Sequence, residues 1–345
     1  MIRVGLLGSG FMGKTHGQAW RQLENARVVV VAGLPLDSAA EVAASVHSEV
    51  TTSLDEVIAR DDVDAIDVCL PTSMHEEFAV KALNTGKHVL CEKPLALSLE
   101  SADRILGAAD KSGRILMVAQ VVRFWPQYRA AYEIVRSGKL GQLLAARVSR
   151  TSRRPNWGAW FNDPEMSGGA LFDLHIHDLD YLVALWGKPQ SVHGLGVKSR
   201  YGSWDYVSTH LDFGCGKAEV EASYLMPDPY PFTTELRLLL ERGLLEYNFR
   251  VAGNIESRDS SESRLTLWKA DGSVLFPAVP ETDGYLAEIQ HFVDCIVAGK
   301  PSERVLNTEV RLVLQIISAI KQSLKTGALV RLQTEDEGMQ EETQR

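Results

Sequence analysis

Apolar positions in the first 120 residues alternate between two patterns. Short continuous apolar runs, typical of strands that a sheet buries on both faces, lie at Ile2–Leu7, Arg27–Ala32, Ala65–Leu70, His88–Cys91 and Ile115–Val118. Between them are stretches with the period of amphipathic helices, namely Phe11–Leu23, Ser38–Ser45, Ser53–Ala59, His75–Asn84 and Leu99–Lys111. Strands that alternate with helices predict an α/β fold, with a doubly wound parallel sheet covered by helices on both faces.

The pattern changes after residue 120. Helical periodicity covers Gln127–Ser137 and then runs from Gly169 to Trp186. Strands with alternating apolar residues follow at Gln190–Lys198, Tyr206–Phe213, Lys217–Leu225, Thr234–Glu241, Leu244–Arg250 and Arg264–Lys269. Short turns between successive strands predict a large, mainly antiparallel open sheet. Two helices, Tyr285–Val297 and Thr308–Lys325, complete an α+β second domain.

Composition narrows the class of protein. The 345 residues are 45% hydrophobic and 23% charged, as in globular proteins, and the net charge of −9 argues against a nucleic-acid partner. The four cysteines form no CxxC pair, which favours reduced thiols over disulfides or a zinc site. No apolar run is long enough to span a bilayer, and the first residues lack the features of a signal peptide. We therefore expect a cytoplasmic protein that does not bind a membrane.

A glycine-rich turn follows the first strand directly. The segment Gly8-Ser9-Gly10-Phe11-Met12-Gly13 fits the GxGxxG pattern between a strand and a helix. In this pattern the first glycine permits a tight turn, the second lets the main chain approach a pyrophosphate, and the third lets helix and strand pack closely. The N–H groups at the helix start then face the anion. The turn predicts that residues 1–120 form a Rossmann domain that binds a dinucleotide.

The choice of dinucleotide is less defined. An acidic residue usually ends the second strand and binds the ribose hydroxyls, but Gly33 stands at that position. Asp37 is a candidate substitute, and Ser38 is a candidate donor to a 2′-phosphate. No arginine lies within residues 33–40. NAD and NADP therefore both stay open, with a slight preference for NAD.

Polar groups follow two further strands of this domain. Glu92-Lys93-Pro94 comes at the carboxyl end of one strand, and Leu70-Pro71-Thr72 with His75 follows another. Ligands of open α/β sheets bind at these ends. A lysine ammonium there can stabilise the negative charge that develops on an alcohol oxygen as its proton leaves. The alternative is a solvated Lys-Pro turn without a function.

With these motifs the chain resembles the Gfo/Idh/MocA family of oxidoreductases, which includes glucose–fructose oxidoreductase and inositol 2-dehydrogenase. The resemblance runs from the glycine turn through Glu92-Lys93-Pro94 to Asp173 and His177. It implies that Lys93 lies beside the nicotinamide and binds the reacting hydroxyl, while Glu92 helps to hold Lys93 and the cofactor. It also implies that Gln120 lies near the nicotinamide carboxamide, and that the protein is a homodimer or homotetramer formed through the second-domain sheet.

A second dense group of polar residues contains Asp173 and His177. On one helix these positions, i and i+4, share a face. An imidazole can accept the proton of an alcohol, and a neighbouring carboxylate can orient it. The resemblance implies that His177 is the general acid/base and that Asp173 contacts the substrate and Lys93. Adjacent His175 and Asp178 raise a metal site as an alternative, but the spacing fits no zinc motif and we expect no metal. A packed helix start without chemistry is the other alternative.

Candidate substrate residues lie mostly in the segment before this helix. They are Arg123, Arg153, Asn156, Trp157 and Trp160, together with Lys93, Asp173 and His177. The two tryptophans can stack on the apolar face of a sugar, and Asn156 and Arg153 can bind its hydroxyls. Arg153 with Arg154 can instead select a carboxylate or phosphate. The structural alternative is a surface loop whose aromatic residues pack at an oligomer contact.

The sequence thus predicts an NAD(P)-dependent oxidoreductase that transfers hydride between a sugar or polyol hydroxyl and nicotinamide, with Lys93, Asp173 and His177 as its catalytic residues. Residues 121–333 form the domain for substrate binding and oligomerisation, and 334–345 form an acidic, disordered tail. Two alternatives use the same cofactor: a glycosidase that retains NAD and acts by transient oxidation, and a non-catalytic dinucleotide sensor. The residues expected to bind the cofactor are Gly8, Ser9, Gly10, Phe11, Met12, Gly13, Asp37, Leu70, Pro71, Thr72, His75, Glu92, Lys93 and Gln120.

Overall fold

The computed structural model describes residues 1–156, 158–251 and 264–332. The chain forms two compact units, and each unit takes several pieces of the chain. The first unit contains Met1–Arg129, Asn156–Gly168 and Pro280–Leu314, and the second contains Ala130–Pro155, Gly169–Val279 and Gln315–Arg345. The predicted tail, 334–345, and Trp157 lie outside the described residues.

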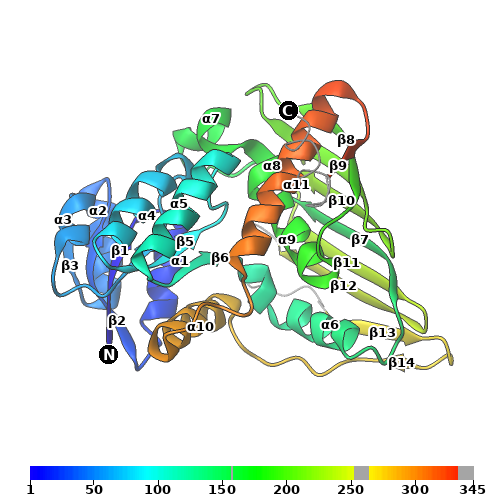
Figure 1. The fold of residues 1–345 in the computed structure, drawn as a ribbon, viewed down its shortest axis with the longest axis horizontal. Helices are drawn as coiled ribbons and strands as arrows, with labels where there is room; N and C mark the ends of the chain where they lie inside the picture. Colours follow the sequence, from blue (N-terminus) through cyan, green and yellow to red (C-terminus); the bar gives the residue numbers. More distant parts are fainter. Residues whose placement is uncertain (157, 252–263, 333–345) are drawn as a thin grey trace, which may run out of the picture. The chain divides into compact units, whose positions relative to one another are not determined.

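The first unit is built on a six-stranded parallel sheet (Figure 1). Its strands are β1 (Ile2–Leu7), β2 (Ala26–Ala32), β3 (Glu49–Thr51), β4 (Ala65–Val68), β5 (His88–Glu92) and β6 (Leu116–Ala119). Their spatial order, β3-β2-β1-β4-β5-β6, is the order of a dinucleotide-binding doubly wound sheet. The predicted fold class is therefore confirmed. The edge strand β3 was not predicted, because three residues are too few to show a period.

The first unit contains ten helices among its described residues, and the longer ones pack in two groups. Along the chain they are α1 (Phe11–Trp20), α2 (Leu36–Val46), α3 (Leu54–Ala59), η1 (Thr72–Met74), α4 (His75–Asn84), α5 (Leu99–Ser112), η2 (Val121–Phe124), η3 (Ala159–Asn162), α7 (Pro164–Ser167) and α10 (Gly284–Ala298). Helix α1 contacts α2 and α10, whereas α4 contacts α3 and α5. Trp20 on α1 meets Phe292 on α10 edge to face, with ring centroids 6.5 Å apart. A helix from the last quarter of the chain thus completes the first unit.

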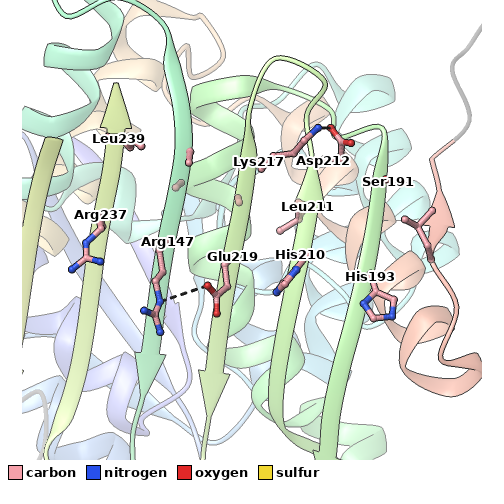
Figure 2. A pocket seen from close by; sticks show the side chains of 14 residues that line it. Arg147, Ser191, His193, His210, Leu211, Asp212, Lys217, Glu219, Arg237 and Leu239 are labelled. Atoms are coloured by element: carbon pink, nitrogen blue, oxygen red, sulfur yellow. Dashed lines mark hydrogen bonds and ion pairs between the residues drawn. The ribbon is translucent and has the colours of Figure 1, made fainter. Parts of the chain in front are cut away.

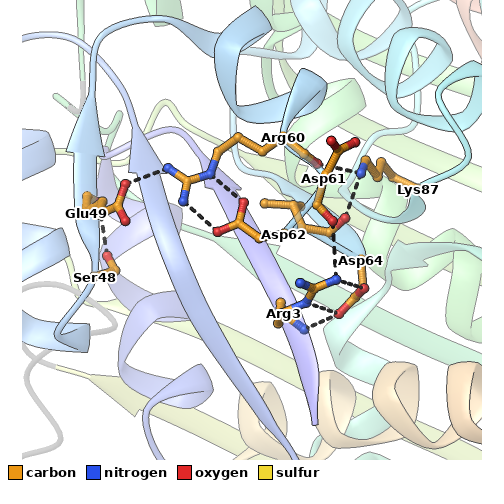
Figure 3. A network of polar contacts seen from close by, with 9 residues as sticks. Arg3, Ser48, Glu49, Arg60, Asp61, Asp62, Asp64 and Lys87 are labelled. Atoms are coloured by element: carbon orange, nitrogen blue, oxygen red, sulfur yellow. Dashed lines mark hydrogen bonds and ion pairs between the residues drawn. The ribbon is translucent and has the colours of Figure 1, made fainter.

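Ion pairs join the amino ends of the parallel strands, opposite the glycine turn (Figure 3). The Arg3 guanidinium binds Asp64 at 2.7 Å, which ties the start of β1 to the start of β4. The ammonium of Lys87, just before β5, donates to the carbonyl oxygens of Arg60 and Val63, each at 2.7 Å. Several of these groups are solvent-exposed, so water and salt weaken the attraction between the charges. We assign this network to strand alignment.

The second unit is built on a nine-stranded sheet (Figure 1). Its strands are β7 (Leu143–Thr151), β8 (Ser191–Lys198), β9 (Trp204–Asp212), β10 (Lys217–Ser223), β11 (Phe232–Leu240), β12 (Gly243–Val251), β13 (Thr266–Lys269), β14 (Val274–Leu275) and β15 (Val330–Arg331). Their order is β14-β13-β12-β11-β7-β10-β9-β8-β15. Only β7 and β10 pair in parallel among the described strands of this sheet, so the predicted mainly antiparallel sheet is confirmed.

Strand β7, at the centre of this sheet, was missed by the sequence prediction. It pairs with β10 on one side and β11 on the other. Its apolar alternation is broken by Arg150, which is only 2% exposed. The guanidinium of Arg150 binds the carboxylate of Asp178 at 2.8 Å inside the unit. In the sequence, a strand that contains a buried arginine looks like a polar loop. The partner of Arg150, Asp178, is too far along the chain to be recognised from the local pattern.

The helical run predicted from Gly169 to Trp186 is divided into α8 (Gly169–Asp173) and α9 (His175–Trp186). This corrects the prediction of one helix that carries both Asp173 and His177. Helix α8 packs on β9 and β10, and α9 packs on β7 and β10. The remaining helices are α6 (Pro126–Arg136) and α11 (Asn307–Thr326). Among the described residues, no helix combines the length and apolarity that crossing a bilayer requires.

Candidate functional site

The glycine turn has the geometry that its sequence predicts. Gly8 has φ +110°, and a Cβ there would lie 2.3 Å from the main-chain oxygen of Cys69. A Cβ on Gly13 would lie 2.0 Å from the oxygen of Gly8. On Gly10, in contrast, a Cβ would meet nothing within 4 Å. The main chain is therefore open at the one glycine where a pyrophosphate must approach.

The position of Ser9 explains why residue 33 is a glycine and not the acidic residue that usually ends the second strand. A Cβ on Gly33 would lie 2.6 Å from the Ser9 hydroxyl oxygen, so the two positions share one volume. Ser9 is 3% exposed, and its hydroxyl has no hydrogen-bond partner in the described part of the chain. The Ser38 hydroxyl donates to the main-chain oxygen of Ser9 at 2.8 Å. Asp37 is exposed in the first turn of α2. A buried hydroxyl without a partner beside an open glycine turn fits a bound dinucleotide.

The loops after β4 and β5 are tied together. His75 is buried, with Nε2 2.9 Å from the oxygen of Leu70 and Nδ1 2.9 Å from the oxygen of Pro94. Burial lowers the pKa of His75, so its ring is neutral. Glu92 is 5% exposed and accepts the main-chain N–H of Lys93 at 2.9 Å. The sheet thus holds Lys93 at the end of β5, where the sequence places it.

Gln120 and Arg123 follow β6 and differ in what they bind. Gln120 is 1% exposed, and neither its side-chain nitrogen nor its oxygen has a partner among the described residues. A buried amide in this state fits a ligand that both donates and accepts, such as a carboxamide. Arg123 is also buried, but its guanidinium donates to the oxygen of Arg304 at 2.8 Å and pairs with Glu309. Arg123 therefore holds the chain before α11.

A buried polar cluster on β4, β5 and α1 was not predicted. The Nδ1 of His16 lies 2.9 Å from Oδ2 of Asp67, and its Nε2 lies 3.1 Å from Oε1 of Glu92. The Trp20 indole donates to the same Asp67 oxygen at 2.7 Å, and Cys69 Sγ lies 3.3 Å from His16 Nδ1. Asp67 was the available signal, because a carboxylate within an apolar strand must find a partner.

Three of these groups, His16, Asp67 and Cys69, are close enough to be considered as metal ligands. Burial raises the pKa of the Cys69 thiol, and the Asp67 carboxylate raises it further. Zinc binds the thiolate form, which this environment disfavours. Asp67 already accepts the Trp20 indole N–H and lies beside the His16 ring. Hydrogen bonding therefore accounts for the cluster without a metal ion.

In the second unit, Asp173 and His177 are half-buried, whereas the residues around them are buried. Asp173 accepts a hydrogen bond from the hydroxyl of Tyr224 at the end of β10. Burial raises the pKa of Tyr224, and the Asp173 charge adds to this effect, so the hydroxyl remains a donor. Tyr224 was not predicted, because it lies far from Asp173 in the sequence and no motif marks it.

His175 belongs to the core of the second unit. Its Nε2 is hydrogen-bonded to the hydroxyl of Thr209. Burial lowers the pKa of His175 to about 3. This neutral, buried ring supports the interpretation of His175 as a structural residue.

The predicted substrate segment is divided between the units. Arg153 is half-buried and binds Asp228 at 2.8 Å, within the second unit. Arg154, beside it, pairs with Asp205. Asn156 begins the next piece of chain, which belongs to the first unit, and is exposed.

Trp160 is half-buried and meets Phe161 edge to face, with centroids 5.4 Å apart. Both residues belong to the first unit. The indole of Trp160 is thus packed on one side by its own unit.

The doubly wound sheet, the open glycine turn and the polar residues at the strand ends define a dinucleotide-binding protein of the Rossmann class. Residues 2–120 match the model of the oxidoreductase family with an NAD-binding Rossmann fold, and residues 128–246 match the GFO/IDH/MocA C-terminal domain. The chain belongs to the Gfo/Idh/MocA family of oxidoreductases. The resemblance seen in the sequence is confirmed.

Relatives of known name differ in substrate and in cofactor. The D-xylose 1-dehydrogenase (NADP(+)) 2 of Haloferax volcanii is 30% identical over 283 residues, which are 81% of this chain and 84% of the relative. The scyllo-inositol 2-dehydrogenase (NAD(+)) of Bacillus subtilis is 28% identical and covers 96% of each chain. The solved structure of levoglucosan dehydrogenase with NADH superposes with a TM-score of 0.83 at 23% identity, covering 96% of this chain and 99% of that one.

Proposed function

We propose that the protein oxidises a hydroxyl of a sugar or polyol, inositol-like or aldose-like, with transfer of hydride to NAD(P), and that it also catalyses the reverse reaction. The observation that carries the proposal is Lys93, held by Glu92 at the carboxyl end of β5 in a sheet with an open glycine turn. Relatives named as xylose and inositol dehydrogenases support the substrate class. In this proposal residues 1–120 bind the cofactor and residues 121–333 bind the substrate.

The bound nicotinamide supplies the hydride acceptor. The Lys93 ammonium binds the reacting hydroxyl and stabilises the negative charge that develops on its oxygen. His177 takes the hydroxyl proton as general base and returns it as general acid in the reverse direction. Asp173 binds a substrate hydroxyl, and Tyr224 fixes the Asp173 carboxylate through its own hydroxyl. Gln120 offers its amide to the carboxamide of the cofactor.

The test begins with a screen of polyols and aldoses, each with NAD and with NADP. The absorbance of the reduced nicotinamide reports turnover. On the best substrate, Lys93→Ala and His177→Ala should each lower kcat/KM by about 10²–10⁴-fold, because each removes a proton-transfer or charge-stabilising group. Lys87→Ala is the matched control, since its ammonium binds carbonyl oxygens at the opposite end of the sheet.

Three outcomes contradict the proposal. Near-normal turnover of both variants would remove the assigned roles. Cleavage of glycosides without accumulation of free NADH would show the glycosidase instead. Dinucleotide binding without turnover on any substrate would show the sensor.

We propose NAD as the preferred cofactor. The Asp37 carboxylate, exposed in the first turn of α2, would repel a 2′-phosphate and can accept ribose hydroxyls. The Ser38 hydroxyl is already donated to Ser9, which removes the predicted donor to a phosphate. The ratio of kcat/KM for the two cofactors in the screen tests this preference, and a ratio in favour of NADP overturns it.

We also propose a homodimer or homotetramer formed through the outer face of the nine-stranded sheet. Figure 2 shows part of this face, where Arg147 and Glu219 lie 3.7 Å apart on neighbouring strands. Exposed apolar side chains lie on the same face, with Leu195 62% and Leu239 45% exposed. This face carries positive, negative and apolar side chains. Such a face can be complementary to the same face of a second copy related by a two-fold axis. The four free thiols suit assembly in a reducing compartment such as the cytoplasm.

The oligomer is tested by sedimentation velocity. Leu195→Asp with Leu239→Asp should convert the assembly to a smaller species, because two charges would be buried in the interface. Val297→Asp, at a 71% exposed position on α10, is the control and should leave the mass unchanged. A double variant with the wild-type mass would contradict this interface.

A further inference from the structure

A buried histidine outside the proposed chemistry lies between two carboxylates. His16 on α1 is 0% exposed. Its Nδ1 lies 2.9 Å from Asp67 on β4, and its Nε2 lies 3.1 Å from Glu92 on β5. Since β4 and β5 are neighbours in the sheet, the ring connects side chains from two adjacent strands.

The two carboxylates on either side of this ring favour its charged form. A neutral imidazole has one N–H, so one of its nitrogens would face a carboxylate oxygen with a lone pair. Both carboxyl groups also accept N–H donors elsewhere: Asp67 from the Trp20 indole at 2.7 Å, and Glu92 from the main chain of Lys93 at 2.9 Å. An imidazolium neutralises part of two buried negative charges, through a hydrogen bond from Nδ1 to Asp67 and through charge alone between Nε2 and Glu92, since Nε2 makes no hydrogen bond among the described residues.

The other groups that face His16 are uncharged or acidic. Cys69, just after β4, has its Sγ 3.3 Å from Nδ1, and the ring of Tyr285 on α10 lies 6.2 Å from the His16 ring between centroids. Burial raises the pKa of both groups, so they stay protonated, and the nearby Glu288 carboxyl on α10 adds to the effect on Tyr285. Burial by itself lowers the pKa of His16, but Asp67 and, less strongly, Cys69 raise it, and together they place the pKa well above its usual value.

His75 in the same unit is an internal comparison. It is equally buried, and each ring nitrogen also lies 2.9 Å from an oxygen. Those oxygens are neutral main-chain carbonyls, so they cannot offset the cost of burying a charge, and burial lowers the pKa of His75. The two histidines differ in the charge of their acceptors and therefore should differ in protonation.

We propose that His16 is a positioning residue, an imidazolium at neutral pH that holds the Glu92 carboxylate and, through it, the main chain of Lys93. The carboxylate of Glu92 is then fixed from two sides, by His16 at Oε1 and by the Lys93 N–H at Oε2. Loss of His16 removes the charge that lies between Glu92 and Asp67, and we expect the end of β5 to move. The effect on turnover rests on the proposed function of Lys93, whereas the charge of His16 does not.

The charge is tested without any substrate. In protein labelled with ¹⁵N-histidine, both ring nitrogens of His16 should show protonated shifts from pH 6 to pH 8, while His75 should show one protonated nitrogen. The spectrum of His16→Gln assigns the signals. A neutral His16 ring at pH 7, including one that accepts a hydrogen bond from a protonated Glu92 carboxyl, overturns the inference whether or not the protein is a dehydrogenase.

Kinetics then test the positioning role. His16→Gln should lower kcat about 10- to 100-fold, as expected for a displaced catalytic group, with a smaller change in the KM of the sugar. Its pH–activity profile should also differ from that of the wild type, because the titrating His16 ring is lost. Cys69→Ser keeps the bridge between carboxylates and is the control. A folded His16→Gln enzyme with the kcat and pH profile of the wild type would overturn the role.

Discussion

Three glycines of the turn at residues 8–13 have different physical tasks, although the motif treats them alike. Gly8 and Gly13 are required by the protein itself, because a Cβ on either would overlap main-chain atoms. Gly10 is required only by the ligand, since a Cβ there has open space. The sequence motif predicts the three positions. The structure shows that two of them are needed for the fold and one for the ligand.

Alanine substitutions should therefore have separable effects. Gly10→Ala should keep the melting temperature of the wild type and lose dinucleotide affinity by about tenfold or more, since its methyl group occupies the space for the pyrophosphate. Gly13→Ala should lower the free energy of unfolding by about 1–3 kcal/mol, the cost of overpacking. Thermal unfolding and NADH fluorescence titration measure both. A Gly10→Ala protein that binds NADH normally would show that the cofactor does not approach this glycine.

At the scale of secondary-structure elements, the buried pair Arg150–Asp178 joins β7 to α9. The side chains are 2% and 0% exposed, and two hydrogen bonds connect them, at 2.8 and 3.2 Å. Burial raises the pKa of Asp178 in spite of the arginine. The pair therefore depends on both members being present.

Substitution of one residue of the Arg150–Asp178 pair should lower the free energy of unfolding more than substitution of both. Arg150→Met should lower the free energy of unfolding by about 3–5 kcal/mol, because it leaves a buried carboxyl without a partner, and Arg150→Met with Asp178→Leu should recover most of the loss. Arg147→Met is the control on the same strand, where the exposed pair with Glu219 contributes at most about 1 kcal/mol. Urea unfolding measures all three. Equal losses in the single and double variants would show that the pair is not energetically coupled.

Prediction of elements from the sequence succeeded where burial follows a period. The strand Ile2–Leu7 and the helix His75–Asn84 have the predicted bounds, because continuous burial and one-sided burial leave distinct patterns. It failed at β7, where a buried charge interrupts the pattern. It also joined α8 and α9 into one helix, since both are apolar and the break at Leu174 carries no glycine or proline.

At the scale of the whole molecule, two buried histidines make stability depend on pH in opposite directions. Burial lowers the pKa of His175 to about 3. Below about pH 6.5 this ring is therefore protonated in the unfolded chain and still neutral in the folded chain. Its contribution therefore decreases as the pH falls from 6.5 toward 3. His16 has a raised pKa, so its contribution is full below about pH 6.5 and is lost as the pH rises through the folded value.

Two variants should each reduce the pH dependence of the free energy of unfolding, one on the acid side and the other on the alkaline side. At pH 5 the His175 contribution costs the wild type about 2 kcal/mol relative to pH 7, and His175→Gln should lack this loss. His16→Gln should lack part of the decline above pH 7. Urea unfolding at intervals from pH 4.5 to pH 9 measures both, and the reverse assignment, with His16→Gln altering only the acid limb, would refute the proposed charge of His16.

The sequence by itself determined the alternation of strands and helices from β1 to β6, apart from the short strand β3, together with the glycine turn and the Glu-Lys-Pro segment. These features depend on periodic burial and on residues adjacent in the chain, so local pattern is enough to reveal them. Only the tertiary structure decided that α10 completes the first unit, that Ser9 occupies the volume beside Gly33, and that His16 lies between Asp67 and Glu92. Such pairings arise when the fold buries charges from distant parts of the chain together, and a buried charge takes whichever partner the packing brings to it.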